Sequence, residues 1–179
     1  LGIWTASVAN YAYWWRRLKQ DRDPTKVVGQ DNFFRYLPRK GIVLRFQQQS
    51  TIFDLLRTAA AALTVGADFE ISYSQGGETS SAFHWIELDP MLKIVEESES
   101  TFLQRVRQGK IQRVRLFESP SQELKEAAAE HPVHLIDAPV LANGRLELLH
   151  YLREVSISID YHRYGNLGPR EGELRKPIL

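Results

Sequence analysis

The chain has 179 residues, of which 43% are hydrophobic and 25% are charged, which is typical of one globular domain and excludes general disorder. The formal net charge of +1 gives no electrostatic footprint for nucleic acid, and no apolar run approaches the roughly 20 residues that span a bilayer. The absence of cysteine excludes disulfides, thiolate zinc sites and a cysteine nucleophile in this chain, and it fits a cytoplasmic location.

The first predicted element is a helix over residues 5–20, in which apolar residues recur at helical spacing. Tyr13 and Trp14 leave apolar surface on a second face beside that of Trp15. Core packing is the favoured use of these aromatics. The alternative is an inter-domain or inter-subunit patch, for which Tyr13, Trp14 and Trp15 are the candidates.

After a Pro- and Gly-containing connector over 21–40, predicted strands and helices alternate as far as residue 160. The strands are expected at 41–46, 68–73, 92–97, 111–117, 133–138 and 155–160, and the helices at 52–63, 99–109, 119–132 and 143–154. Between them lie a turn-rich loop at 74–82 and an extended segment at 83–88. The alternation predicts a Rossmann-like α/β fold, with three layers and an open, mainly parallel sheet that has helices on both faces.

The expected organisation has three parts. Residues 1–28 form an N-terminal helix and connector, residues 29–168 form the Rossmann-like α/β domain, and residues 169–179 form a C-terminal tail. Because the sequence begins at Leu1 and not at Met, we expect a fragment or a processed product.

The sequence around the first predicted βα turn, "RFQQQSTIF", contains no glycine, whereas a dinucleotide site needs close backbone approach to the pyrophosphate. Independent dinucleotide binding is therefore disfavoured. The helix that begins near Ser50 could still attract an anion through its free N–H groups.

Catalytic and metal-binding patterns are also missing from the sequence. His134 and Asp137 lie three residues apart on a predicted strand, so their side chains face opposite sides. No nucleophile elbow and no H-E-x-x-H spacing is present. We therefore assign no catalytic residue and no metal ligand, and an independent hydrolase or transferase lacks a nucleophile–base pair.

The octapeptide "YHRYGNLG" at 161–168 directly follows the last predicted strand. Its glycines permit a sharp turn, and an arginine offers a planar fork for a carboxylate or phosphate. A tail docked on the sheet or on another domain is favoured over a ligand-binding loop. The candidate binding or docking residues are His162, Arg163, Tyr164, Gly165 and Asn166.

Two segments carry a family resemblance: "GQDNFFRYLPRKGIVLR" at 29–45 and "YLREVSISIDYHRYGNLG" at 151–168. They resemble the C-terminal part of bifunctional proline-utilization flavoenzymes, which join a proline dehydrogenase to a 1-pyrroline-5-carboxylate dehydrogenase of the aldehyde dehydrogenase superfamily. The resemblance implies a non-catalytic Rossmann-like domain that serves as a lid or in assembly. It also implies that NAD and FAD belong to the parent enzyme and that no cofactor binds this chain.

The partners implied by the resemblance are the rest of the parent polypeptide and possible further copies in a homo-oligomer, with no nucleic acid and no membrane span. The alternative hypothesis is a stand-alone α/β module that binds a nucleotide or small anion through the helix start at Ser50 and through Arg163.

Overall fold

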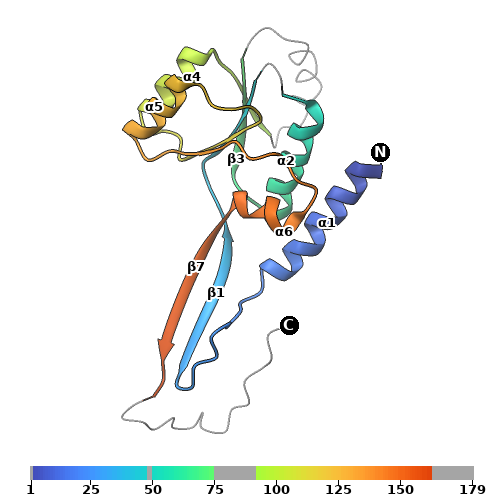
Figure 1. Cartoon of the computed structure of the whole chain (residues 1–179), viewed down its shortest axis with the longest axis vertical. Helices are drawn as coiled ribbons and strands as arrows, with labels where there is room; N and C mark the ends of the chain where they lie inside the picture. Colours follow the sequence, from blue (N-terminus) through green and yellow to red (C-terminus); the bar gives the residue numbers. More distant parts are fainter. Residues whose placement is uncertain (1, 48–49, 75–91, 163–179) are drawn as a thin grey trace.

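The computed structural model describes residues 2–47, 50–74 and 92–162. It shows an α/β body from which a long two-stranded ribbon extends (Figure 1). The elements of the chain, in order, are α1 (Gly2–Leu18), β1 (Gln30–Pro38), β2 (Ile42–Phe46), α2 (Ile52–Val65), β3 (Phe69–Tyr73), β4 (Lys93–Glu96), α4 (Glu99–Arg107), β5 (Arg113–Leu116), α5 (Gln122–Glu130), β6 (His134–Ile136), α6 (Gly144–Glu147), the 3₁₀ helix η1 (Leu148–Tyr151) and β7 (Leu152–Asp160).

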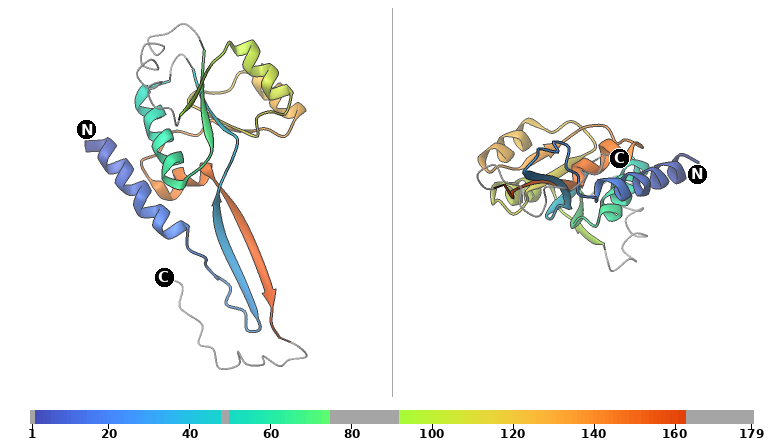
Figure 2. Two further views of the ribbon diagram at one scale, coloured as in Figure 1. Left: turned by 180° about the vertical axis from the view of Figure 1, so that it is seen from behind. Right: turned by 90° about the horizontal axis from the view of Figure 1, so that it is seen from below.

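The body is built on a parallel five-stranded sheet in the order β4-β3-β2-β5-β6. Helices α4 and α5 cover one face, while α1, α2 and the α6–η1 segment lie on the other (Figure 2). All five residues of the central strand β2 are buried, as expected for a parallel strand that is covered on both faces. The predicted α/β fold, with a mainly parallel sheet between two helical layers, is confirmed.

Two apolar clusters form the core, one on each face of the sheet. Residues of β2 alternate between them: Ile42 and Leu44 point toward α1 and α2, whereas Val43 points toward α4 and α5. The Ala-rich middle of α2 allows that helix to lie close to the strands. The core therefore covers both faces of the sheet and takes in only the root of the ribbon, at Leu152 and Tyr36.

The ribbon pairs β1 with β7 in an antiparallel register that runs from Gln30 opposite Asp160 to Pro38 opposite Leu152. Two sequence expectations were wrong here. The proposed connector at 21–40 contains the nine-residue strand β1, and the last strand joins β1 and not the parallel sheet. The reason is that this pairing joins residues more than a hundred positions apart, so no local pattern marks it.

Element ends differ from the predictions in two further places. The helix expected at 143–154 ends at Tyr151, through a 3₁₀ turn, and β7 begins at once. The helix expected at 119–132 spans Gln122–Glu130, because the side chain of Ser121 accepts the hydrogen bond from the backbone N–H of Leu124 and so acts as the cap.

Most of the predicted loop at 74–82 and all of the segment at 83–88 lie outside the described residues. Within the described part of the chain, no helix is both long and apolar enough to cross a membrane.

Candidate functional site

Within residues 2–47, 50–74 and 92–162, one edge of the ribbon is covered by the chain itself and the other is unpaired. Arg22 and Phe34 exchange backbone N–H···O hydrogen bonds of 3.1 and 2.7 Å, so the peptide groups of Phe34 point away from β7. Antiparallel pairs alternate in this respect, so Ser156, which lies opposite Phe34, points its own peptide groups away from β1. By the same alternation Glu154 and Ser158 present N–H and C=O groups along the outer edge of β7. These groups have no hydrogen-bond partner in the described part of the chain.

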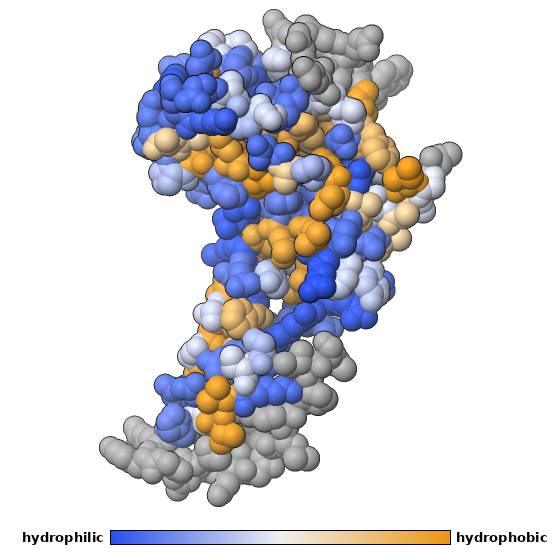
Figure 3. Space-filling view, viewed as in Figure 1, coloured by the Kyte–Doolittle hydropathy of each residue, from blue (hydrophilic) through white to orange (hydrophobic). Residues whose placement is uncertain are grey.

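The two faces of the ribbon differ in polarity. On one face the hydroxyl of Ser158 donates to the amide oxygen of Asn32 at 2.7 Å, and that of Tyr36 donates to Glu154 at 2.7 Å. The opposite face carries five apolar side chains: Leu37 near the body, and four that we call the apolar row, Phe33, Val155, Ile157 and Ile159. The charged residues Asp31, Arg35 and Arg153 lie on this face as well. Ile159 is 49% exposed. Figure 3 shows apolar surface on the ribbon as well as on the body.

The far end of the ribbon holds the first two residues of the octapeptide. The backbone N–H of Tyr161 donates to the carbonyl of Gly29 at 2.9 Å, and its hydroxyl accepts from the Gly29 N–H at 3.2 Å. Nδ1 of His162 lies 3.1 Å from the same carbonyl. His162 is thus held at the turn before β1. The other candidates for the docked tail, Arg163 to Asn166, lie outside the described residues.

The predicted aromatic patch lies on α1, which packs against α2 and α6. Trp14 and Trp15 are partly buried and pack against the core, and the Arg145 guanidinium lies 5.7 Å from the ring centre of Trp14. Tyr13 is 42% exposed and meets Trp14 edge-on. Both tryptophans therefore contribute to the body, and Tyr13 is the most solvent-facing of the three.

A cavity of about 680 Å³ lies beyond the carboxyl ends of β5 and β6, where open α/β sheets usually hold ligands. Three carboxylates line it: Asp54, Glu118 and Asp137. Ser50, the expected anion-binding helix start, is buried and donates to Glu118 at 3.4 Å, and the helix cap is Thr51. The acidic lining disfavours a pyrophosphate at this edge.

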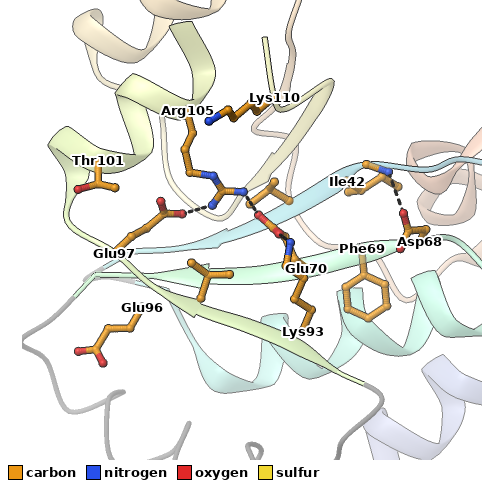
Figure 4. A pocket seen from close by; sticks show the side chains of 13 residues that line it. Ile42, Asp68, Phe69, Glu70, Lys93, Glu96, Glu97, Thr101, Arg105 and Lys110 are labelled. Carbon is orange, nitrogen blue, oxygen red and sulfur yellow. Dashed lines mark hydrogen bonds and ion pairs between the residues drawn. The ribbon is translucent and has the colours of Figure 1, made fainter. Parts of the chain in front are cut away.

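A second cavity, of about 640 Å³, lies along the face of β3 and β4 beside α4 (Figure 4). Arg105 lies between the carboxylates of Glu97 and Glu70, and Glu70 also binds Lys93. Burial acts to raise the pKa of Glu70, but the hydrogen bonds from Lys93 and Arg105 outweigh it and lower that pKa below its ordinary value. The charges that line this cavity are thus largely paired with one another.

Deeper in the body, Arg115 and Glu147 form an ion pair of 3.3 Å in which both side chains are fully buried. Arg115 also donates to the carbonyl of Ala138 at 2.5 Å, and the hydroxyl of Tyr151 donates to Glu147 at 2.9 Å. Burial, followed by the charge of Glu147, holds the pKa of Tyr151 well above its ordinary value. This network ties β5 to α6 and η1, and it accounts for a buried arginine without invoking a ligand.

No protein-family profile matches the sequence, and no curated protein matches it. Among solved structures, the chain is similar to Proline Utilization A (PutA) from Corynebacterium freiburgense, with a TM-score of 0.59 and 25% identity over 90% of this chain and 14% of that one. It is similar in fold to Staphylococcus aureus AldH, with a TM-score of 0.54 and 12% identity over 75% of this chain and 31% of the other. It is also similar in fold to the NAD+ complex of aldehyde dehydrogenase from Bacillus cereus. The TM-score is 0.54 and the identity is 14%, over 73% of this chain and 29% of the other.

The chain therefore has an α/β fold that is similar to the folds of these aldehyde dehydrogenases. It is also similar to part of PutA, as the resemblance of residues 29–45 and 151–168 predicted. It spans only about a seventh of the length of the PutA chain that it matches.

Proposed function

We propose that this chain is a non-catalytic, aldehyde-dehydrogenase-like domain of a larger proline-catabolic oxidoreductase, and that it serves in assembly or as a lid. The observation that carries the proposal is the ribbon. It projects from the body with a β7 edge that pairs with no other strand among the described residues, and with the apolar row on one face.

Open strand edges in folded proteins are usually covered or made unattractive to other strands, because unpaired N–H and C=O groups invite pairing. The β7 edge contains no proline, and its charged residues, Arg153, Glu154 and Asp160, lie toward its two ends and leave Val155–Ile159 uncharged. A strand from the rest of the parent polypeptide, or from a second copy, would satisfy Glu154, Ser156 and Ser158 by strand addition. The apolar row supplies buried area for the same contact.

The likeness to PutA supports an NAD-dependent 1-pyrroline-5-carboxylate dehydrogenase as the parent, with NAD and FAD bound elsewhere in it. Two features support a role without chemistry for this domain. The chain contains no cysteine to act as the nucleophile that the resemblance implies for the parent, and three carboxylates line the cavity where a nucleotide would bind.

The mass of the native polypeptide tests whether a larger parent exists. An immunoblot of source cells with an antibody to this domain should show a band several times larger than 20.6 kDa. A single band at 20.6 kDa would refute the proposed parent.

A pair of ribbon variants tests the assembly role in the assembled protein. Ile157→Asp places a charge in the apolar row, whereas Ser158→Asp places the same charge on the polar face, one residue away. Ile157→Asp alone should change the assembled protein. Light scattering should then show a lower mass, or size-exclusion chromatography should show a larger hydrodynamic radius. If both variants assemble like the wild type, the ribbon is not the assembly surface.

A further inference from the structure

Four basic side chains meet at the amino edge of the sheet, where the ribbon joins the body. Arg113 and His134 are the first residues of β5 and β6, and they lie directly opposite each other in the parallel register. Arg39 follows the end of β1, and His150 lies in η1 just before β7. Strands, helix and ribbon thus place cationic groups at one junction.

Both arginines are held by backbone carbonyls at the end of η1. Nη1 of Arg113 donates to the carbonyl of His150 at 2.8 Å, and Nε of Arg39 donates to the carbonyl of Leu152 at 3.0 Å. These contacts suit the negative end of a helix. Nε of Arg113 is buried without a hydrogen-bond partner among the described residues, as are the Nε atoms of Arg45, Arg57 and Arg115.

No carboxylate forms an ion pair with Arg39 or Arg113 in the part of the chain that the structure describes. Most other arginines of the core sheet and its helices do face one; these are Arg45, Arg57, Arg105, Arg107 and Arg115. The carboxylate of Glu147 interacts with His150 but is bound to Arg115 and Tyr151.

Burial, and after it the charges within the group, lower the pKa values of three of its members. Burial, followed by the charge of Arg39, lowers the pKa of Arg113 to about 10. Burial and then the charges of Arg113 and Arg39 lower the pKa of His134. Burial is also the main cause of the lowered pKa of His150, against the opposing effect of Glu147. The described part of the chain therefore holds Arg39 and Arg113 near each other, and neither of them forms an ion pair with a carboxylate there.

We propose that Arg39, Arg113 and His134 form a binding site for a small oxyanion, a phosphate or a carboxylate, at the root of the ribbon. The planar guanidinium fork matches both kinds of oxyanion, and His134 is exposed, so the site is open to solvent. An anion here offsets the repulsion between the two arginines and fixes the carbonyls at which η1 turns into β7. The proposal does not rest on the assembly role of the ribbon.

Thermal unfolding of the whole chain tests the site with inorganic phosphate and with glutarate, each compared with sodium chloride at equal ionic strength. A ligand at ten times its Kd should raise the Tm by about 3 to 6 °C for a chain of this size, whereas chloride should not. A response to phosphate alone assigns a phosphate site, and a response to glutarate alone assigns a carboxylate site. Equal Tm values in all three salts would overturn the proposal.

Two conservative variants locate the effect. Arg39→Lys keeps the positive charge but removes the planar guanidinium group, and His134→Gln removes the exposed imidazole. In both variants the anion should no longer cause most of the rise in Tm. Arg107→Gln, a surface arginine on α4, is the matched control and should keep it. A shift that survives in both site variants would place the anion elsewhere and refute this site.

The histidine ring signals in NMR give a readout that does not depend on unfolding. Bound phosphate should raise the pKa of His134 back toward its ordinary value of 6.5, since a nearby anion favours the imidazolium. An unchanged titration of His134 at a saturating concentration of the anion that raises the Tm contradicts the proposal.

Discussion

The imidazole of His162 lies against the α-carbon of Gly29 at the far end of the ribbon. A β-carbon placed on Gly29 would come within 2.9 to 3.0 Å of three atoms of that side chain. Gly29 also has a φ of +89°, in the region that other residues rarely adopt. The glycine thus lets the chain turn into β1 and accept the segment that follows β7.

Replacement of Gly29 by alanine should therefore loosen the end of the ribbon. We expect a loss of about 1 to 3 kcal/mol in the local stability of the turn, from the unfavourable φ and from the contact with His162. Hydrogen exchange of the Tyr161 amide, which bonds to the Gly29 carbonyl, reports this directly.

Gly41→Ala is the matched control, because Gly41 has a φ of +67° but nothing lies within 4 Å of the point that a β-carbon would occupy. It should leave Tyr161 exchange unchanged. Equal exchange of Tyr161 in the wild type and in Gly29→Ala would show that His162 is not held there in solution.

The buried pair of Arg115 and Glu147 gives a second prediction. Glu147→Gln leaves the fully buried Arg115 without its counter-charge, so it should lower the free energy of unfolding by about 3 to 5 kcal/mol. Urea denaturation measures the loss. Glu130→Gln breaks an exposed pair with Arg107 and should cost less than about 1 kcal/mol. Similar urea midpoints for Glu147→Gln and Glu130→Gln would contradict the view that burial makes the pair of Arg115 and Glu147 important for stability.

The body was more predictable from sequence than the ribbon, for a physical reason. The helix α2 carries its own end signals, with a capping Thr51 and the left-handed Gly66, and β2 is an uninterrupted apolar run apart from Arg45. Such signals are local. The strand β1 shows its burial pattern only when it is paired with β7, and that pairing depends on the whole body being folded.

The same limit applies to the sites. The residues of the octapeptide could be singled out from sequence because they stand together, and the structure describes His162 among them. The basic group of Arg39, Arg113 and His134 could not, because its members come from three distant segments. Only the parallel register and the return of the chain at η1 bring them to one edge.

Acid should weaken the network around Glu70. The pKa of this carboxyl is lowered in the folded chain, since the hydrogen bonds from Lys93 and Arg105 outweigh the opposing effect of burial. The unfolded chain therefore takes up the proton at higher pH. The stabilisation is present above the ordinary pKa of 4.5 and is lost as the pH falls through the folded value.

Glu70→Gln should consequently be less stable than the wild type at neutral pH, and its stability should fall less steeply below pH 4.5. Urea midpoints of the wild type and of Glu70→Gln, measured at several pH values across this range, show how steeply the stability of each protein depends on pH. Parallel slopes for the two proteins would mean that Glu70 is not paired in solution.

The last prediction concerns the aromatic residues of α1. The sequence favoured core packing for these rings over an interface patch, and Trp14 and Trp15 both pack against the core. Trp15→Ser should lower the free energy of unfolding by about 2 to 4 kcal/mol, as expected when a large, partly buried ring is removed. Tyr13→Ser, at a more exposed position on the same helix, should cost less than about 1 kcal/mol. If Trp15→Ser instead keeps the urea midpoint of the wild type and reduces the mass of the assembled protein in light scattering, the ring belongs to an interface and not to the core.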